Sequence, residues 1–185
     1  ILDDGSEVIV IDGDAQSGKT SLAIKLFLDT EKKSILSLFL KNKDIRVRKN
    51  KAEEDVEKII KTSFEKQYEV ACKSFEEFKQ QENKILFIDD FSIETLGKEN
   101  FRVFFEYLKN VFKKIFIFTT SSLNWQIKLK GLFDGRVSFF KILPFNNKQR
   151  SELCEKYFTF YENRDFDKEE NDDLDLLKNC CVMLR

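Results

Sequence analysis

The sequence predicts an α/β fold in which a mainly parallel sheet of five strands lies between two layers of helices. Short runs of apolar, often β-branched residues alternate along the chain with longer segments whose apolar residues recur every three to four positions. Such alternation is typical of βαβ units, in which a helix returns the chain to the next parallel strand. Polar residues follow several of these runs, at the strand ends where open α/β sheets bind ligands.

Five segments have the length and composition of strands. Each is a short run rich in apolar, β-branched or aromatic residues, as expected of strands buried in a parallel sheet. In chain order they are Glu7–Asp12, Ser34–Leu40, Ile85–Asp89, Ile115–Thr119 and Val137–Leu143, which Pro144 ends.

The segments between the strands have helical spacing. Lys19–Asp29 is apolar on most sides, so we expect it to be buried against the sheet. The spacing from Ala52 to Phe78 fits one long helix, or two helices with a break near Ser63–Gln67. Apolar residues three and four apart predict an amphipathic helix over 101–112 and another over 153–161.

Charged segments and one proline suggest how the chain is divided. Lys41–Lys51 has six basic residues and one Asp, and we expect it to be a solvated loop. Residues 162–175 have eight acidic and two basic residues, which predicts a surface loop or the start of a new subdomain. We place the boundary near Pro144, with one domain over 1–144 and the start of a helical subdomain over 145–185. Because no Met precedes Ile1, we expect a fragment of a larger multidomain protein.

Composition excludes several kinds of site. The chain has no histidine, which excludes Ser-His-Asp triads and histidine metal ligands. The four cysteines, Cys72, Cys154, Cys180 and Cys181, have no CxxC spacing, so the sequence predicts no zinc site and a reducing, cytoplasmic setting. A net charge of -1 gives no overall argument for nucleic acid or an anionic membrane, and no apolar run is long enough to span a bilayer.

The turn after the first strand matches the phosphate-loop pattern GxxxxGK[ST] at every fixed position, as GDAQSGKT. Glycines let consecutive backbone N–H groups line one concavity around a polyphosphate. The helix that starts at Lys19 adds its positive end, Lys19 can reach the β- and γ-phosphates, and Thr20 can bind Mg²⁺. The predicted nucleotide-binding residues are Gly13, Asp14, Ala15, Gln16, Ser17, Gly18, Lys19, Thr20 and Ser21.

The third strand, within KILFIDD, ends in two carboxylates. In nucleotide hydrolases with a phosphate loop, an Asp at this strand end holds Mg²⁺, and Asp89 is the natural candidate. Asp90 can polarise the attacking water, and Glu94 is the competing candidate for that role. Lys19, Asp90 and Glu94 are therefore the predicted catalytic residues.

Two further groups are candidates for sensing the nucleotide. The fourth strand ends in hydroxyls at Thr119, Thr120 and Ser121, which either sense the γ-phosphate or cap the next helix. Arg136 precedes the fifth strand. It is either an ordinary surface residue or an arginine finger that stabilises transition-state charge in a neighbouring subunit.

With these residues in place, the chain resembles the STAND branch of P-loop ATPases and, within it, the NACHT-like domains. The resemblance rests on Gly13–Thr20, on FIDDF at Phe87–Phe91, on TTSS at Thr119–Ser122 and on the run Arg136–Phe158. The chain departs from NACHT domains in reading DDFSIE where a further D-E pair is usual. The related AAA+ family is the next match, because the GR at Gly135–Arg136 precedes a strand that ends in Leu-Pro.

The resemblance implies a three-layer P-loop fold and a regulatory switch that holds ADP when closed and Mg²⁺–ATP when triggered. Such a switch hydrolyses ATP slowly and forms homo-oligomers when ATP-bound, in signalling or antiviral defence (innate immunity). The alternative is an AAA+-type ATPase that acts on nucleic acid or as a remodeller or loader, which only the basic stretch Lys41–Lys51 supports locally. A module that keeps nucleotide for stability and a small-molecule kinase are further alternatives. The absence of an N/T-K-x-D motif favours ATP over GTP.

Overall fold

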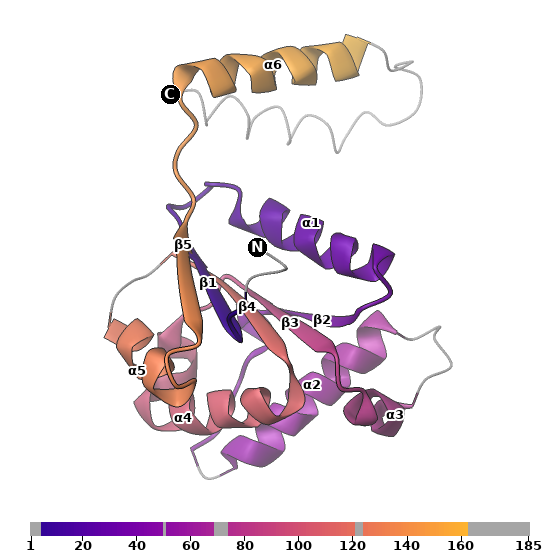
Figure 1. The fold of residues 1–185 in the computed structure, drawn as a ribbon, viewed down its shortest axis with the longest axis vertical. Helices are drawn as coiled ribbons and strands as arrows, with labels where there is room; N and C mark the ends of the chain where they lie inside the picture. The colour runs from indigo at the N-terminus through magenta and orange to yellow at the C-terminus, as the bar shows by residue number, and fades with distance from the viewer. Residues whose placement is uncertain (1–4, 50, 69–73, 121–123, 163–185) are drawn as a thin grey trace. The chain divides into compact units, whose positions relative to one another are not determined.

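The alternating strands assemble into a parallel sheet with the order β2-β3-β4-β1-β5. The computed structural model describes residues 5–49, 51–68, 74–120 and 124–162, and the chain divides into two compact units, 1–142 and 143–185. The sheet belongs to the first unit (Figure 1), and the predicted fold class is confirmed. The strands are β1 (Val8–Asp12), β2 (Leu36–Lys41), β3 (Lys84–Asp89), β4 (Lys114–Thr119) and β5 (Val137–Lys141).

Helices connect the strands much as their apolar spacing predicts. The long segment after β2 forms two helices, and residues 69–73 between them lie outside the described part. The helix after β4 was named only as the one that the Thr119–Ser121 hydroxyls would cap, and no residue range was predicted for it, although its buried Trp125 and Leu129 are four residues apart. The helices are α1 (Lys19–Lys32), α2 (Ala52–Gln67), α3 (Phe75–Gln80), α4 (Ile93–Val111), α5 (Asn124–Leu132) and α6 (Asn147–Glu162), with a 3-10 turn η1 at Asn42–Asp44.

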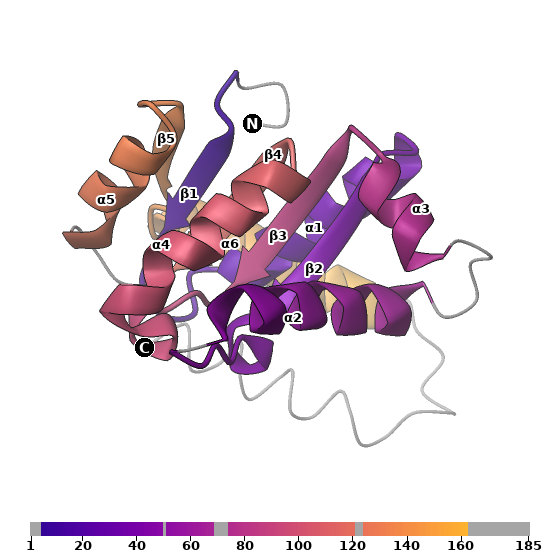
Figure 2. The ribbon, with the colours of Figure 1, turned by 90° about the horizontal axis from the view of Figure 1, so that it is seen from below.

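The first unit has three layers because alternate strand residues point to opposite faces of the sheet. On one face, Ile9 and Ile11 of β1 belong to a buried cluster with Ala23 of α1. On the other face, Val8 and Val10 belong to a larger cluster with residues of α2, α4 and α5. Figure 2 shows α2 and α4 on the opposite side of the strands from α1. The predicted burial of α1 against the sheet is thus confirmed on one side of the helix, while Ile24 and Leu28 on its outer side are exposed.

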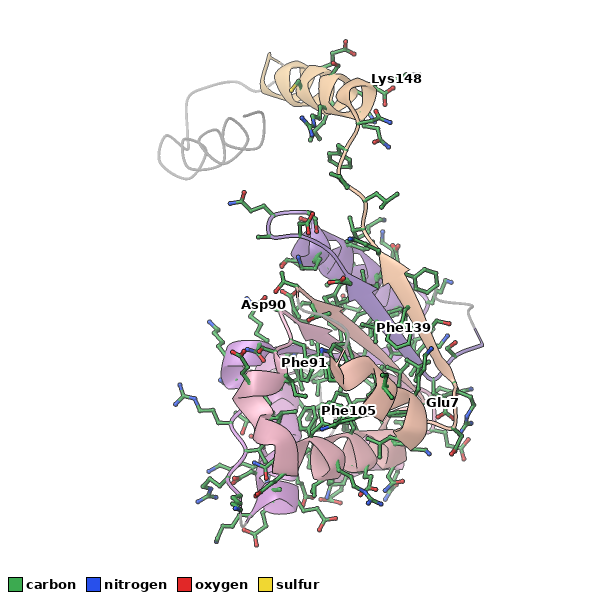
Figure 3. All side chains as sticks on the ribbon, turned by 90° about the vertical axis from the view of Figure 1, so that its left-hand side faces the viewer. Glu7, Asp90, Phe91, Phe105, Phe139 and Lys148 are labelled. Atoms are coloured by element: carbon green, nitrogen blue, oxygen red, sulfur yellow. The ribbon has the colours of Figure 1, made fainter. Side chains whose placement is uncertain are left out.

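Aromatic packing fixes the end of β3, where the acidic pair lies. Phe91 is 2% exposed, and its ring meets Phe105 of α4 at 5.7 Å and Trp125 of α5 at 5.3 Å between centroids, both in edge-to-face geometry. Figure 3 shows Phe91 close to the carboxyl end of β3 and Phe105 on the helices beneath. Such aromatic pairs add about 0.5–1.5 kcal/mol beyond burial. The residue after Asp90 is therefore an anchor that holds the chain at this strand end.

The outer edge of β2 is closed by side chains from the end of α2. The Gln67 side chain accepts a hydrogen bond from Phe39 N at 2.9 Å and donates one to Phe39 O at 2.7 Å. The Tyr68 hydroxyl donates to Ser37 O at 2.6 Å. Unpaired strand edges are sites of aggregation, and here side-chain amide and hydroxyl groups take the place of a further strand.

The basic segment Lys41–Lys51 is more ordered than a solvated loop. Its Ile45 is fully buried, and Asn100 of α4 donates to Val47 O at 2.9 Å. Arg48 donates to Asp55 from its backbone N at 2.8 Å and from its guanidinium at 2.6 Å. The segment is thus a loop with exposed basic side chains, as expected, but its backbone is held in place because Ile45 is buried and Val47 is partly buried between the basic residues.

This Arg48–Asp55 contact predicts how stability changes in acid. The guanidinium hydrogen bond, followed by that of the Arg48 backbone N–H, lowers the pKa of Asp55 from 3.8 to about 2. Because the folded pKa is below the unfolded one, the contribution is fully present above pH 4 and is lost as the pH falls toward 2. We expect an Arg48→Gln variant to lose less stability between pH 4 and 2 than the wild type, measured by urea unfolding. Equal losses would contradict this prediction, and the Lys61→Gln variant, which removes an exposed lysine of α2, is the control.

The second unit contains α6, whose start carries a reciprocal capping pair. Asn146 Oδ1 accepts from Gln149 N, and Gln149 Oε1 accepts from Asn146 N, both at 2.9 Å. These contacts satisfy backbone donors that a helix start leaves free. The helix predicted over 153–161 is present and begins earlier than expected, while the boundary at Pro144 stays a prediction. Across the part of the chain that is described, no helix combines the length and apolarity needed to cross a membrane.

Candidate nucleotide-binding site

The loop Gly13–Thr20 connects β1 to α1 with the backbone of an anion-binding turn. Gln16 and Gly18 have positive φ angles of 61° and 86°, and Gly18 is the N-cap of α1. Ser17 N donates to Asp14 O at 3.2 Å, and Gly13 N donates to Thr119 O of β4 at 3.3 Å. The loop is thereby tied to the carboxyl edge of the sheet, with the positive end of α1 behind it.

Gly13 and Ser17 approach each other closely inside the loop. A Cβ atom built on Gly13 would lie 2.6 Å from Ser17 Oγ and 3.2 Å from Ile142 Cβ, so any other residue here would require both side chains to move. Ser17 Oγ is buried and has no hydrogen-bond partner among the described residues. Buried hydroxyls are rarely left without a partner, so Ser17 Oγ is an unsatisfied donor inside the loop.

Lys19 is the buried cation of the loop. Its side chain belongs to a residue that is 8% exposed, and its Nζ donates to Gly13 O at 2.9 Å and to Asp14 O at 2.6 Å. These contacts fold the lysine back over the loop, where its ammonium group lies beside the backbone that would hold a polyphosphate. This geometry is compatible with phosphate binding by Lys19, and that role stays a prediction.

Thr20 and Asp89 meet although 69 residues separate them in the chain. Thr20 Oγ1 donates to Asp89 Oδ2 at 3.0 Å and lies 3.3 Å from Oδ1. Asp89 is 6% exposed at the end of β3, and β4 lies between β3 and β1. A carboxylate and a hydroxyl at the loop are oxygen ligands of the kind that Mg²⁺ prefers, so these two residues fit a magnesium site.

Asp90 occupies a strained position beside Asp89. It is exposed, and its φ of 56° lies in the left-handed region, which Asp tolerates better than most residues. The turn is held on both sides, because Phe91 N donates to Phe118 O at 2.8 Å and Thr119 Oγ1 donates to Phe91 O at 2.9 Å. Strain that the surrounding structure enforces is often found at functional sites.

The three predicted sensor hydroxyls have different surroundings. Thr119 is fully buried, and its hydroxyl bonds the turn after Asp90. Thr120 is exposed at the carboxyl edge of the sheet, while Ser121 lies outside the described residues. Thr120 is therefore a better candidate than Thr119 for a hydroxyl that senses the γ-phosphate. This role stays a prediction.

Glu94 and Arg136 lie apart from the loop contacts. Glu94 is exposed in the first turn of α4, where its backbone N donates to Ser92 Oγ at 3.3 Å. Arg136 precedes β5 at the amino edge of the sheet, and its guanidinium pairs with Glu7 and, at 3.7 Å, with Asp134. Figure 3 shows Glu7 and Asp90 at opposite ends of the strands. A five-residue strand is about 16 Å long, so Arg136 is too far to reach a nucleotide in its own loop.

Asn42 is a site residue that the sequence analysis missed. It follows β2, and its Oδ1 accepts from Ser92 N at 3.2 Å, two residues beyond Asp90. An amide side chain directly after a buried strand was the available signal.

Comparison with known proteins identifies the kind of domain. A family model described as an AAA domain matches residues 5–150, and no curated protein matches the chain. Similar solved structures include AMPPCP-bound DnaA from Aquifex aeolicus, at 18% identity and a TM-score of 0.52. The matched region covers 95% of this chain and 53% of the DnaA chain. A DNA replication initiation factor has the same identity and TM-score, with 88% of this chain and 47% of that one covered.

The Drosophila ORC bound to DNA is a third similar structure, at 14% identity and a TM-score of 0.52, with 85% of this chain and 43% of that one covered. At such identities the likeness concerns the fold. The chain spans about half the length of these proteins, between 43% and 53%.

Proposed function

The chain belongs to the AAA domain family, and on that premise we propose that it is the ATP-binding domain of a magnesium-dependent ATPase that acts on nucleic acid as a loader or remodeller. The observation that carries the ATPase assignment is the contact between Thr20 and the buried Asp89 beneath the phosphate loop. This contact brings together, from distant parts of the chain, the two oxygen ligands that the chemistry requires.

Binding and charge neutralisation fall to the loop itself. The backbone N–H groups after Gly13 and the free hydroxyl of Ser17 donate to the phosphates. Lys19 exchanges its two carbonyl partners for phosphate oxygens, which as anions are the stronger acceptors. Thr20 and Asp89 would hold Mg²⁺, which neutralises charge on the β- and γ-phosphates when bound.

Asp90 is the residue that we assign to the attacking water. It is exposed beside Asp89, and the fixed turn through Phe91 keeps its backbone in one conformation. A carboxylate there accepts a proton from water or orients it toward the γ-phosphate. Glu94 is four residues further along, in the first turn of α4, and is the alternative for the same role.

A second copy of the chain would complete the site. Arg136 lies one strand length from its own loop, so it serves hydrolysis only if it enters the site of a neighbouring subunit. The proposal therefore includes a homo-oligomer in the ATP-bound state. Arg136 is half exposed, with 51% of its side chain accessible, which suits a residue that changes partners on assembly.

The choice of nucleic acid over a defence switch follows from the similar folds. The structures that match include a DNA replication initiation factor and an ORC bound to DNA. Neither the family model nor these structures single out the STAND branch, so the resemblance to NACHT-like domains has no support beyond its loose motifs. The basic segment after β2 is consistent with a polyanionic partner.

The test combines mass and turnover for the full-length protein. Light scattering would be recorded with ADP and then with ATP and Mg²⁺, beside an ATPase assay with and without a DNA oligonucleotide. We expect ATP-dependent assembly and turnover that DNA stimulates and added salt suppresses. Assembly with slow turnover that does not change when DNA is added would instead favour the switch. The absence of any hydrolysis would contradict the ATPase assignment.

A further inference from the structure

We propose that Lys41, Lys43 and Arg46 form a basic surface that binds the phosphodiester backbone of a nucleic acid without reading its sequence. This inference rests on the proposed function, because it names the surface through which the ATPase contacts its substrate. All three side chains are exposed; Lys41 ends β2, and Lys43 and Arg46 follow directly after it. Clustered Lys and Arg side chains bind nucleic acid by neutralising phosphates and releasing counterions.

The six cations of the basic segment divide into two groups of three. Arg48 pairs with Asp55 at 2.6 Å, Lys49 with Glu99 at 2.8 Å, and Lys51 with Glu54 at 3.5 Å. Lys41, Lys43 and Arg46 have no ion pair with any residue of the described ranges. The first group ties the segment to the fold, whereas the second group is left to interact with an external anion.

The backbone that carries the second group is fixed before any ligand binds. Ile45 N donates to Asn42 O at 3.0 Å within the η1 turn, and the Ile45 side chain is fully buried. Asn100 of α4 holds Val47 O on the far side of Arg46. Binding therefore orders only the three side chains, and a preformed backbone lowers the entropic cost of association.

The basic surface begins at the same edge of the sheet as the nucleotide site. Lys41 is the register partner of Asp89 across β2 and β3, so both lie at the carboxyl ends of their strands. A nucleic acid bound here would lie next to the ATP site of the same chain. This placement also means that Lys41 is unsuitable for a clean test, because its loss changes the charge beside Asp89.

The experiment compares two variants of the full-length protein that each lose two positive charges. Lys43→Gln/Arg46→Gln leaves Lys41, the register partner of Asp89, in place, and Lys58→Gln/Lys128→Gln removes two exposed lysines of α2 and α5. Fluorescence anisotropy with a labelled single-stranded DNA would give affinities across a salt series. Two lost phosphate contacts lower the slope of log affinity against log salt by about 1.4. We expect that change, with at least about fivefold weaker binding at low salt, only in the first variant.

Several outcomes separate this inference from the proposed function. Equal binding by the two variants would overturn the basic surface alone. The absence of DNA binding by a wild type that hydrolyses ATP would overturn both the basic surface and the nucleic-acid part of the proposed function, and would leave the ATPase assignment intact. Titration with a fluorescent ATP analogue should give the same affinity for the first variant and the wild type. A loss of nucleotide affinity with unchanged DNA binding would mean that Lys43 and Arg46 serve the nucleotide, and the inference would be wrong.

Discussion

A Lys19→Ala variant is expected to bind ATP at least about 100-fold more weakly than the wild type. The lysine supplies the buried positive charge of the phosphate loop, and its hydrogen bonds to phosphate oxygens are charge-assisted. Two such bonds, each worth about 1.5–3 kcal/mol, exceed the roughly 2.7 kcal/mol that a 100-fold loss represents. A fluorescent ATP analogue, titrated with Mg²⁺ present, measures the affinity directly.

The matched control for this variant is Lys25→Ala. Lys25 is on the same helix, but its side chain is 64% exposed and pairs with Asp29 at 3.2 Å. Circular dichroism of both variants checks that α1 still forms, since Lys19 also bonds two loop carbonyls. If the folded Lys19→Ala protein bound nucleotide as tightly as the Lys25→Ala protein, the loop would not be a phosphate site.

The sequence predicted the turn after β1 and the start of α1 at Lys19 because the pattern that determines them is local, while phosphate binding by this turn stays a prediction. Eight consecutive residues, Gly13–Thr20, determine the turn, the glycine positions and the start of the helix. The acidic pair at Asp89 and Asp90 was equally visible, since it follows a buried strand. Strand periodicity likewise predicted all five strands to within one or two residues at each end.

Other parts of the site depend on strand order, which a single sequence does not encode locally. Insertion of β4 between β1 and β3 decides that the Thr119 hydroxyl bonds the turn after Asp90. The direct pairing of β2 with β3 explains why Asn42, which follows β2, accepts a hydrogen bond from Ser92, which follows β3. Sequence spacing gives no indication of either contact.

The motifs of the chain were sufficient to predict a P-loop ATPase but not to predict its branch. A loop such as Gly13–Thr20 and an acidic strand end are shared by the branches of P-loop ATPases, so they do not separate STAND proteins from other AAA+ domains. The segments that were meant to separate them, such as Thr119–Ser122 and the run after Arg136, are short or loosely matched. The family model, which spans residues 5–150, weighs the whole domain and supports the AAA domain.

The Asp90→Asn variant is expected to bind ATP normally and to lose about 100-fold or more in turnover. General-base residues contribute about 10²–10⁴ to enzymatic rates, and an amide cannot accept the proton. Asn tolerates the left-handed conformation of this position as Asp does, so the substitution preserves the turn. Single-turnover hydrolysis of bound ATP, measured on the assembled protein, separates the chemical step from binding.

Two companion variants make this result specific. Asp89→Asn removes the carboxylate that Thr20 contacts, so it should weaken the magnesium-dependent part of nucleotide binding as well as turnover. Glu94→Gln changes an exposed carboxylate in the next helix and should leave turnover within about threefold of the wild type, because Asp90 alone acts on the water in this assignment. If Glu94→Gln lost turnover and Asp90→Asn kept it, the roles would be exchanged. The strained φ of Asp90 would then serve only to aim the chain from β3 into α4.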